Sequence, residues 1–506
     1  MPVLKVIVSN GSALEALYSR QGFASVQQAL DTLIQADDKR GITTKVIYLD
    51  DQKIMQGLNA PPVSNPGDDR QNKTAIDAVC TALRPDYLVI LGAPDIVPMQ
   101  RLDNPLAGDG DADVPSDLPY ACSGAYSRNI LNFLNPTRVV SRLPGINGNK
   151  NPDALNKAIG AAAIIEPQLH RIYEKYLAIS AKVWRNSSTA STRNIFGNAD
   201  ALQLSPPDGP DWSNAQLDSL SHFINCHGAN NDPKWYGQDG NQYPDAMKAA
   251  QINNKLKIGT IAAAECCYGA QLYPAPEGTQ SGICNTYLSN GAAAFCGSST
   301  IAYGPADGQG QADLITQYFL VNLLGGASAG RAMLEARQKF IQTAAPLGPT
   351  DLKTVAQFNV MGDAASHPVA AALSVLAAAS PDVSHVEVIA MEIAARRRQL
   401  QLAGDALGRN ARWLERLPQL PMVKAVEEGL GELARRAGIA EWTHEAFRET
   451  GGEEIMADWE QGASRAIVHV LFGKRADKAP GPNLAVVKAT EVSGRLIASE
   501  IQYSKS

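Results

Sequence analysis

The stretch that decides the fold is Ile258–Gln271, IGTIAAAECCYGAQ, in which a short apolar run leads into two adjacent cysteines. Small and apolar side chains in such a run are typical of a strand that is buried on both faces of a parallel sheet. The YGA that follows lets the chain turn away from the sheet. Because parallel strands present catalytic groups at their carboxyl ends, we expect the two cysteines to lie at one edge of the sheet.

A second stretch, Ser221–Gly228, SHFINCHG, has the same layout and ends in a His-Gly pair. A free thiol has a pKa of roughly 8.5, so an imidazole must polarise it at neutral pH and later protonate the leaving amine. We expect His227 to be this base, and the backbone amide of Gly228 is open to face an oxyanion. Together the two stretches predict a cysteine nucleophile with its base, as in a cysteine peptidase.

Several further segments extend the pattern and resemble one family. The CHG and ECCYG motifs, taken with these segments, resemble the gingipain family of cysteine peptidases, relatives of the caspases, legumains and metacaspases. The likeness runs from about residue 75 to about residue 370. The segments are PDYLVILGAPDIVP at Pro85–Pro98, RVVSRLP at Arg138–Pro144, GAAAFCGSSTIAYG at Gly291–Gly304 and QFNVMGD at Gln357–Asp363.

The resemblance implies a caspase-like α/β/α sandwich with a mainly parallel central sheet. A smaller α/β half would occupy residues 1–150, and the catalytic half would follow at 151–370. Alternation of apolar runs and a helical pattern in the first 50 residues favours this α/β order. The side-chain spacing predicts that Asn151–Ala181 is mostly helical. Residues 371–506 read as an α+β appendage, helices and then strands, with a regulatory or docking role.

The resemblance also implies catalytic roles, with His227 as general acid and base and an oxyanion hole formed by the amides of Gly228 and of the nucleophile. Successive strand residues point to opposite faces, so only one of the two cysteines can meet His227. Legumains and metacaspases have an acid, one residue and then the nucleophile, which maps onto Glu265, Cys266 and Cys267. Gingipains have Cys-x-x-Gly, which would start at Cys266. We choose Cys267, keep Cys266 as the alternative nucleophile, and expect Glu265 either to line the specificity pocket or to orient His227.

Substrate contacts are less well defined by the residues. Gingipains place acidic residues before the His-Gly strand, one of which selects a basic side chain; here that segment contains Asp200, but no matching motif. Cleavage after a basic residue therefore stays open. The loop Gly297–Tyr303 resembles the wall of the family's specificity pocket, and Tyr303 and Trp235 are candidate substrate contacts.

Metal binding has two candidate patterns, and neither is complete. The cysteines beside His227 lack the Cys-x(2–4)-Cys spacing of structural zinc sites, so we expect no zinc. Asp109, Asp111 and Asp113 alternate as at the start of a calcium loop, but the glycine at the sixth position and the distal glutamate are missing. A solvated loop is the favoured interpretation; calcium at these aspartates stays an alternative, and no cofactor is expected.

Composition and charge limit the class of protein, its partners and its location. The chain has 506 residues, 45% of them hydrophobic and 19% charged, as in ordinary globular proteins. A net charge of −6 provides no basic excess for nucleic acid. No signal peptide opens the sequence and no run of about 18 apolar residues crosses it, so we expect a cytoplasmic protein without membrane insertion. Seven cysteines, an odd number, argue against a disulfide framework.

The leading hypothesis is an intracellular cysteine endopeptidase that performs limited proteolysis of a partner protein. Bacterial caspase-like peptidases of this kind accompany pore-forming gasdermin-like proteins or other defence effectors, so the resemblance implies such a protein substrate. Two alternatives belong to other classes. One is a catalytically silent caspase-fold binding module. The other is a hydrolase or transferase that uses the same dyad on a non-peptide acyl group.

Overall fold

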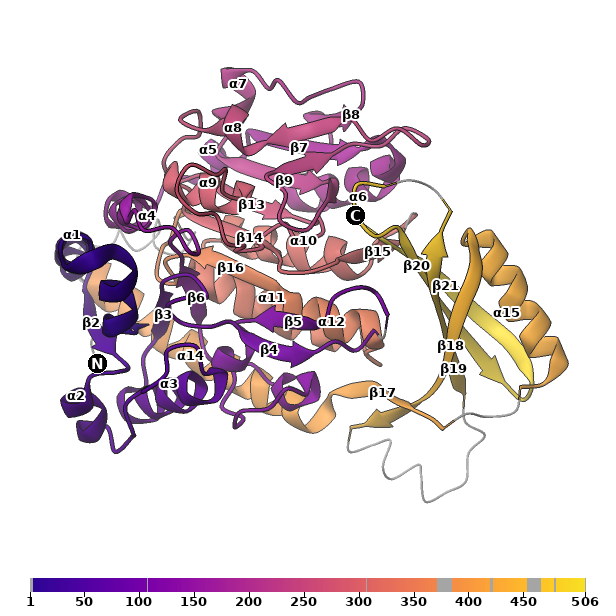
Figure 1. Cartoon of the computed structure of the whole chain (residues 1–506), viewed down its shortest axis with the longest axis horizontal. Coiled ribbons are helices and arrows are strands. Elements are labelled where there is room, and N and C mark those ends of the chain that lie inside the picture. The colour runs from indigo at the N-terminus through magenta and orange to yellow at the C-terminus, as the bar shows by residue number, and fades with distance from the viewer. Residues whose placement is uncertain are drawn as a thin grey trace.

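The protein is an α/β fold around one large sheet, as a computed structural model shows (Figure 1). The structure describes residues 3–106, 108–305, 307–370, 385–418, 422–452, 466–476 and 479–505. The sheet has ten strands in the order β2-β1-β3-β6-β16-β14-β13-β9-β7-β8. They are β1 (Val3–Ser9), β2 (Ile42–Tyr48), β3 (Tyr87–Leu91), β6 (Val140–Leu143), β7 (Tyr176–Ala181), β8 (Leu202–Ser205), β9 (Ser221–Asn225), β13 (Ile261–Ala264), β14 (Ala294–Ser298) and β16 (Phe358–Gly362).

The sheet consists of two parallel halves that run in opposite directions. Strands β2, β1, β3, β6 and β16 pair in parallel, and so do β14, β13, β9, β7 and β8. The two halves meet at β14 and β16, which are antiparallel, with Ala294 opposite Gly362. A Cβ on Gly362 would lie 2.4 Å from the carbonyl oxygen of Ala293, so the junction requires glycine. Strand β16 pairs with β6 of the first half and with β14 of the second, so it joins the two halves into a single sheet.

Helices cover both faces of this sheet. Helices α4 (Asp153–Ile164) and α9 (Ile283–Ser289) contribute to the core on one face, whereas α6 (Arg185–Phe196), α10 (Gln311–Leu324), α11 (Ala329–Thr343) and α12 (Pro349–Gln357) contribute to the core on the other. Neighbouring residues of β14, Phe295 and Cys296, accordingly belong to different cores. The N-terminal half carries α1 (Gly11–Lys39), α2 (Gln52–Gly57) and α3 (Asp69–Leu83); short helices are α5 (His170–Tyr173), α7 (Asn214–Leu217) and α8 (Ala249–Ile252).

The prediction that Asn151–Ala181 is mostly helical is partly wrong. Its first part forms α4, but Tyr176–Ala181 is β7, a fully buried strand between β8 and β9. The side-chain periodicity of a short apolar run does not distinguish a buried strand from a buried helix. Here the segment is a strand because it pairs with the neighbouring strands β8 and β9.

A second, antiparallel sheet forms the C-terminal part, which lies to the right in Figure 1. Its order is β15-β21-β20-β19-β18-β17, and β15 (Tyr303–Pro305) comes from the segment that follows β14 of the large sheet. The last strand of the chain is therefore joined to the segment that follows β14. The other strands of the second sheet are β17 (Arg412–Arg416), β18 (Ile439–Gly451), β19 (Ile467–Arg475), β20 (Leu484–Val492) and β21 (Arg495–Ser504). Helix α15 (Lys424–Arg436) packs on this sheet, whereas α14 (His385–Asn410) packs on α11. Small sheets are formed by β4 (Gln100–Asp103) with β5 (Asp113–Ser116), and by β10 (His227–Gly228), β11 (Lys234–Tyr236) and β12 (Asp245–Lys248).

Two of the segments that resemble the gingipain family carry buried ion pairs. The guanidinium of Arg142, in RVVSRLP, binds both carboxylate oxygens of Asp117 at 2.9 and 2.6 Å and is fully buried. Its third nitrogen donates to two backbone carbonyls. In QFNVMGD, Asp363 accepts from the ammonium of Lys5 at 2.7 Å, which links β1 to the end of β16. These residues hold the sheet together rather than perform chemistry.

Replacing Arg142 should destabilise the protein strongly. Arg142→Ala leaves Asp117 buried without its partner, which typically costs about 3–5 kcal/mol. Arg128 pairs with Asp103 on the surface, so Arg128→Ala is the matched control and should cost at most about 1 kcal/mol. Denaturant unfolding of the two variants measures the difference; equal losses of stability would contradict this role of the buried pair.

Candidate active site

The candidate site lies at one edge of the second half of the sheet. Strands β7, β9, β13 and β14 run parallel, so their carboxyl ends meet at this edge. Ala264, the last residue of β13, lies opposite Ile224 of β9. The chain leaves β9 through His227 and leaves β13 through Cys267, so register alone brings these two segments side by side.

Two backbone amides of these segments converge on one oxygen. The N–H groups of Gly228 and Cys267 both donate to the carbonyl oxygen of Lys505, at 3.0 and 3.1 Å. The N–H of Lys505 donates in turn to the carbonyl of Ala302 at 2.9 Å. A Cβ on Gly228 would lie 1.9 Å from the carbonyl oxygen of Cys267, so the close approach requires glycine. Two amides aimed at one carbonyl oxygen are the arrangement that stabilises an oxyanion in acyl transfer.

His227 is held in a defined orientation and tautomer. Its ring centroid lies 4.3 Å from that of Trp184 and 5.1 Å from that of Tyr243. The Nε2 atom lies 2.7 Å from Oε1 of Gln238, whose own amide nitrogen donates to the carbonyl of Gly240 and to the hydroxyl of Tyr243. An amide oxygen only accepts, so Nε2 carries the hydrogen and Nδ1 is the basic nitrogen. Gln238 is thus a positioning residue, which sequence reasoning missed.

The two adjacent cysteines lie on different faces, as strand geometry predicts. Cys267 belongs to the core that includes Ala302, and its sulfur accepts a hydrogen bond from the N–H of Ala302 at 3.1 Å. Cys266 belongs to the opposite core, and burial, followed by the neighbouring Cys226, raises the pKa of its thiol well above the usual value. A raised pKa disfavours the thiolate form that a nucleophile requires.

A buried acidic pocket surrounds the side chain of Lys505. Its ammonium donates to Oδ1 of Asn225 at 2.8 Å, to Oε2 of Glu265 at 2.9 Å and to Oδ1 of Asp313 at 3.0 Å. The ring of Trp184 lies 4.8 Å from the same nitrogen. Three acceptors match the three donors of an ammonium group. Burial lowers the pKa of Lys505, but the charges of Asp313 and Glu265 raise it by a larger amount. The net pKa is above the usual value, so the ammonium group is charged.

Further hydrogen bonds hold the carboxylates that line the pocket. Ser187 donates to Asp313 at 2.6 Å, and Thr316 donates to Glu265 at 3.1 Å. A Cβ on Gly304 would lie 2.6 Å from Cε of Lys505, so this glycine leaves room for the side chain. Burial first, and then Asp313, raise the pKa of Glu265 well above the usual value. Of the two roles predicted for Glu265, these contacts correspond to lining the pocket.

The three other predicted substrate contacts lie elsewhere. The hydroxyl of Tyr303 lies 3.4 Å from Asp109 in the core, while its backbone pairs with β21. Trp235 packs on Phe295 with ring centroids 6.3 Å apart, and Asp200 is exposed in the loop between α6 and β8. None of these side chains contributes to the polar contacts around Lys505. Asn225 and Asp313 do, and no sequence motif had pointed to them.

Asp109 and Asp111, for which the sequence favoured a solvated loop with calcium as the alternative, contact a lysine. Lys353, fully buried, forms ion pairs with Asp109 and with Asp111, the latter at 2.6 Å. Asp111 also accepts from the hydroxyl of Tyr268 and from the N–H of Ile301, so it braces the turns that follow β13 and β14. Over the described part of the chain, no group of three or more His, Cys, Asp or Glu residues is arranged to hold a metal ion. The calcium alternative stays a prediction.

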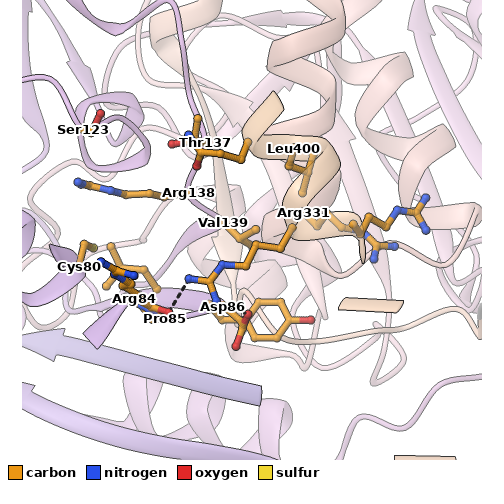
Figure 2. A pocket seen from close by; sticks show the side chains of 15 residues that line it. Cys80, Arg84, Pro85, Asp86, Ser123, Thr137, Arg138, Val139, Arg331 and Leu400 are labelled. Atoms are coloured by element: carbon orange, nitrogen blue, oxygen red, sulfur yellow. Dashed lines mark hydrogen bonds and ion pairs between the residues drawn. The ribbon is translucent and has the colours of Figure 1, made fainter. Parts of the chain in front are cut away.

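A separate cavity of about 280 Å³ lies beside the segments that lead into β3 and β6 (Figure 2). Its walls include Arg138, Arg331 and Leu400. Arg397 of α14 also lines it and pairs with Asp86 at 3.1 Å. None of the residues around Lys505 lines this cavity, so it is not part of the candidate site.

Comparisons with known proteins give little. No family model matches the chain, and no curated protein matches it. Among solved structures, the separase–securin complex of Saccharomyces cerevisiae is similar over 46% of this chain and 14% of that chain, at 14% identity and a TM-score of 0.28. A likeness of this size carries no argument about function. Within the described residues, no helix has the length and apolarity to cross a bilayer.

Changing Gln238 should alter the pH dependence of any activity that uses His227. Gln238→Ala removes the acceptor that orients the ring, and a misplaced base reduces kcat by about 10²-fold. Gln238→Glu restores the acceptor and adds a negative charge, which favours the protonated imidazole. We therefore expect partial rescue of kcat and a shift of the acidic limb of the pH–rate profile to higher pH. A purely structural role for Gln238 would leave this limb unmoved.

Proposed function

We propose that this protein is a gingipain-like cysteine endopeptidase that cuts proteins on the carboxyl side of a lysine. The observation that supports the proposal best is the binding of Lys505, whose carbonyl oxygen meets two amides while its ammonium meets two carboxylates. A peptide bound in this way has its carbonyl carbon beside Cys267 and its side chain in a pocket of matching charge.

The chemistry follows from the residues at the sheet edge. Nδ1 of His227 accepts the thiol proton of Cys267, and the thiolate attacks the carbonyl carbon after the bound lysine. The negative charge that develops on the oxygen is stabilised by the N–H groups of Gly228 and Cys267. The imidazolium then protonates the leaving amine, and water hydrolyses the resulting thioester, which restores the free thiol.

The pocket favours lysine over arginine. Its acceptors, from Asn225, Glu265 and Asp313, surround a single point, which suits the compact ammonium group. A guanidinium is planar and larger, and presents its donors in a fork. Trp184 adds an aromatic face that attracts the cation.

The resemblance to gingipains and caspases extends the proposal to its biological setting. It supports limited proteolysis of one partner in the cytoplasm of a bacterium, with a gasdermin-like or other defence effector as the substrate. The competing function is a catalytically silent binding module of the same fold. Loss of all cleavage on removal of one sulfur separates the two.

The two cysteines should differ sharply when each is replaced. Cys267→Ala removes the nucleophile and should reduce kcat on lysyl peptides by about 10⁴-fold or more. Cys266→Ala is the matched control, because it removes the adjacent thiol from the opposite core and should retain kcat within about tenfold. Hydrolysis of fluorogenic peptides by the two variants measures this. The reverse order of effects would assign the nucleophile to Cys266.

Recognition of lysine should weaken in acid. Because the pKa of Glu265 is raised, this carboxylate becomes neutral at a higher pH than an ordinary glutamate, and its attraction for the substrate ammonium is then lost. We expect KM for lysyl peptides to rise as pH falls through this pKa. Glu265→Gln should raise KM about 10–100-fold, as for loss of a hydrogen bond to a charged group, and should flatten the dependence. An unchanged pH dependence of KM in this variant would contradict the assignment.

A further inference from the structure

The C-terminal strand is bound in the candidate site as a peptide ligand. Lys505 uses its carbonyl, its amide and its ammonium there, and the three residues before it pair antiparallel with β15, with Ser504 opposite Tyr303. We infer that Lys505 is the protein's own inhibitory ligand, so that β21 keeps the site closed until it is displaced. That Lys505 inhibits an enzyme rests on the proposed function, whereas the contacts of Lys505 do not.

The reactive groups are buried while Lys505 occupies the site. The side chain of Lys505 is completely buried, and the exposed fractions of Cys267 and His227 are 1% and 4%. A substrate lysine needs the same two amides and the same acidic pocket. It therefore cannot bind while Lys505 is in place. Each of these contacts belongs to Lys505 itself.

The strand pairing of β21 keeps Lys505 close to the site and still allows Lys505 to leave it. It pairs with β20 over eight residue pairs, from Ala485–Tyr503 to Val492–Arg495, but with β15 over three. The long pairing keeps the lysine near the site at an effective concentration in the mM range, as for a short tether. A dilute substrate is outcompeted under these conditions. The short pairing with β15 is the part that must separate, and the rest of the C-terminal sheet can stay intact when it does.

A ligand that binds the C-terminal sheet can release Lys505 from the site. Anything that binds this sheet better when Lys505 is withdrawn shifts the equilibrium toward the open site. The appendage then links partner binding to proteolysis. This accounts physically for β15, from the segment that follows β14 of the large sheet, being shared with a sheet made otherwise of residues after 411.

The test is the rate at which Cys267 reacts with a lysine-bearing reagent. Full-length wild type, Lys505→Ala and Lys474→Ala are treated with a peptidyl-lysine chloromethyl ketone, and alkylation of Cys267 is followed by mass spectrometry. Lys474 is an exposed lysine of β19 in the same sheet and serves as the control. We expect Lys505→Ala to react at least about tenfold faster, the factor that loss of one hydrogen bond to a charged group gives, and Lys474→Ala to match wild type. A folded Lys505→Ala that reacts no faster than wild type overturns the inference.

A second variant covers the case in which the empty acidic pocket destabilises the fold. Lys505→Met keeps the length and apolar stem of the side chain but removes the ammonium, and thermal unfolding checks that each variant is folded. It should also react faster than wild type; an unchanged rate in a folded Lys505→Met would contradict the inference.

Failure of the inference and failure of the proposed function give different results. If Lys505→Ala is alkylated faster but hydrolyses no lysyl peptide, the inhibitory lysine stands and the peptidase function falls. If wild type and Lys505→Ala hydrolyse lysyl peptides at the same rate, the peptidase function stands and the inhibitory role falls.

Discussion

A single buried ammonium group connects the parts of this structure on which the candidate site depends. Lys505 follows the last described strand, β21, and its nitrogen contacts β9 through Asn225, the end of β13 through Glu265 and α10 through Asp313. Buried carboxylates are stable as anions only with a partner, and a buried ammonium needs acceptors for all three protons. The pocket and its occupant therefore require each other. The charge of Lys505 lowers the pKa of Glu265, which burial and Asp313 raise, so loss of this cation would raise that pKa further.

The sheet provides the frame that makes such a site possible. Parallel pairing of β9 with β13 places His227, Gly228 and Cys267 at one edge, and the two amides come from β10, which follows β9, and from the turn that follows β13. Cys266 and Cys267 follow the end of β13 and belong to different cores. Turns as sharp as these need bracing, and Asp111 supplies it by binding both Tyr268 and Ile301.

Much of this could be predicted from residue patterns. The apolar runs before INCHG and ECCYG are strands, and a large, mostly parallel sheet surrounds them, as expected. The helical prediction for Tyr176–Ala181 was wrong because a six-residue apolar run has no diagnostic period. Asp200 and Tyr303 were candidate substrate contacts because their segments correspond to ones that bind substrate in the resembled family, and Trp235 was a further candidate. The polar groups that surround Lys505 come instead from Asn225, Glu265 and Asp313, which lie far apart along the chain.

The amino-acid sequence by itself determined the local features: which segments are strands, that a histidine and a cysteine follow two of them, and that neighbouring cysteines face opposite sides. Period and composition are local, so a single stretch contains this information. Only the tertiary structure decided that a glutamine orients His227, that Lys353 neutralises Asp109 and Asp111, and that Lys505 occupies the acidic pocket. These contacts join residues that are distant in sequence, and electrostatic pairing in a buried space depends on where the backbone brings the charges.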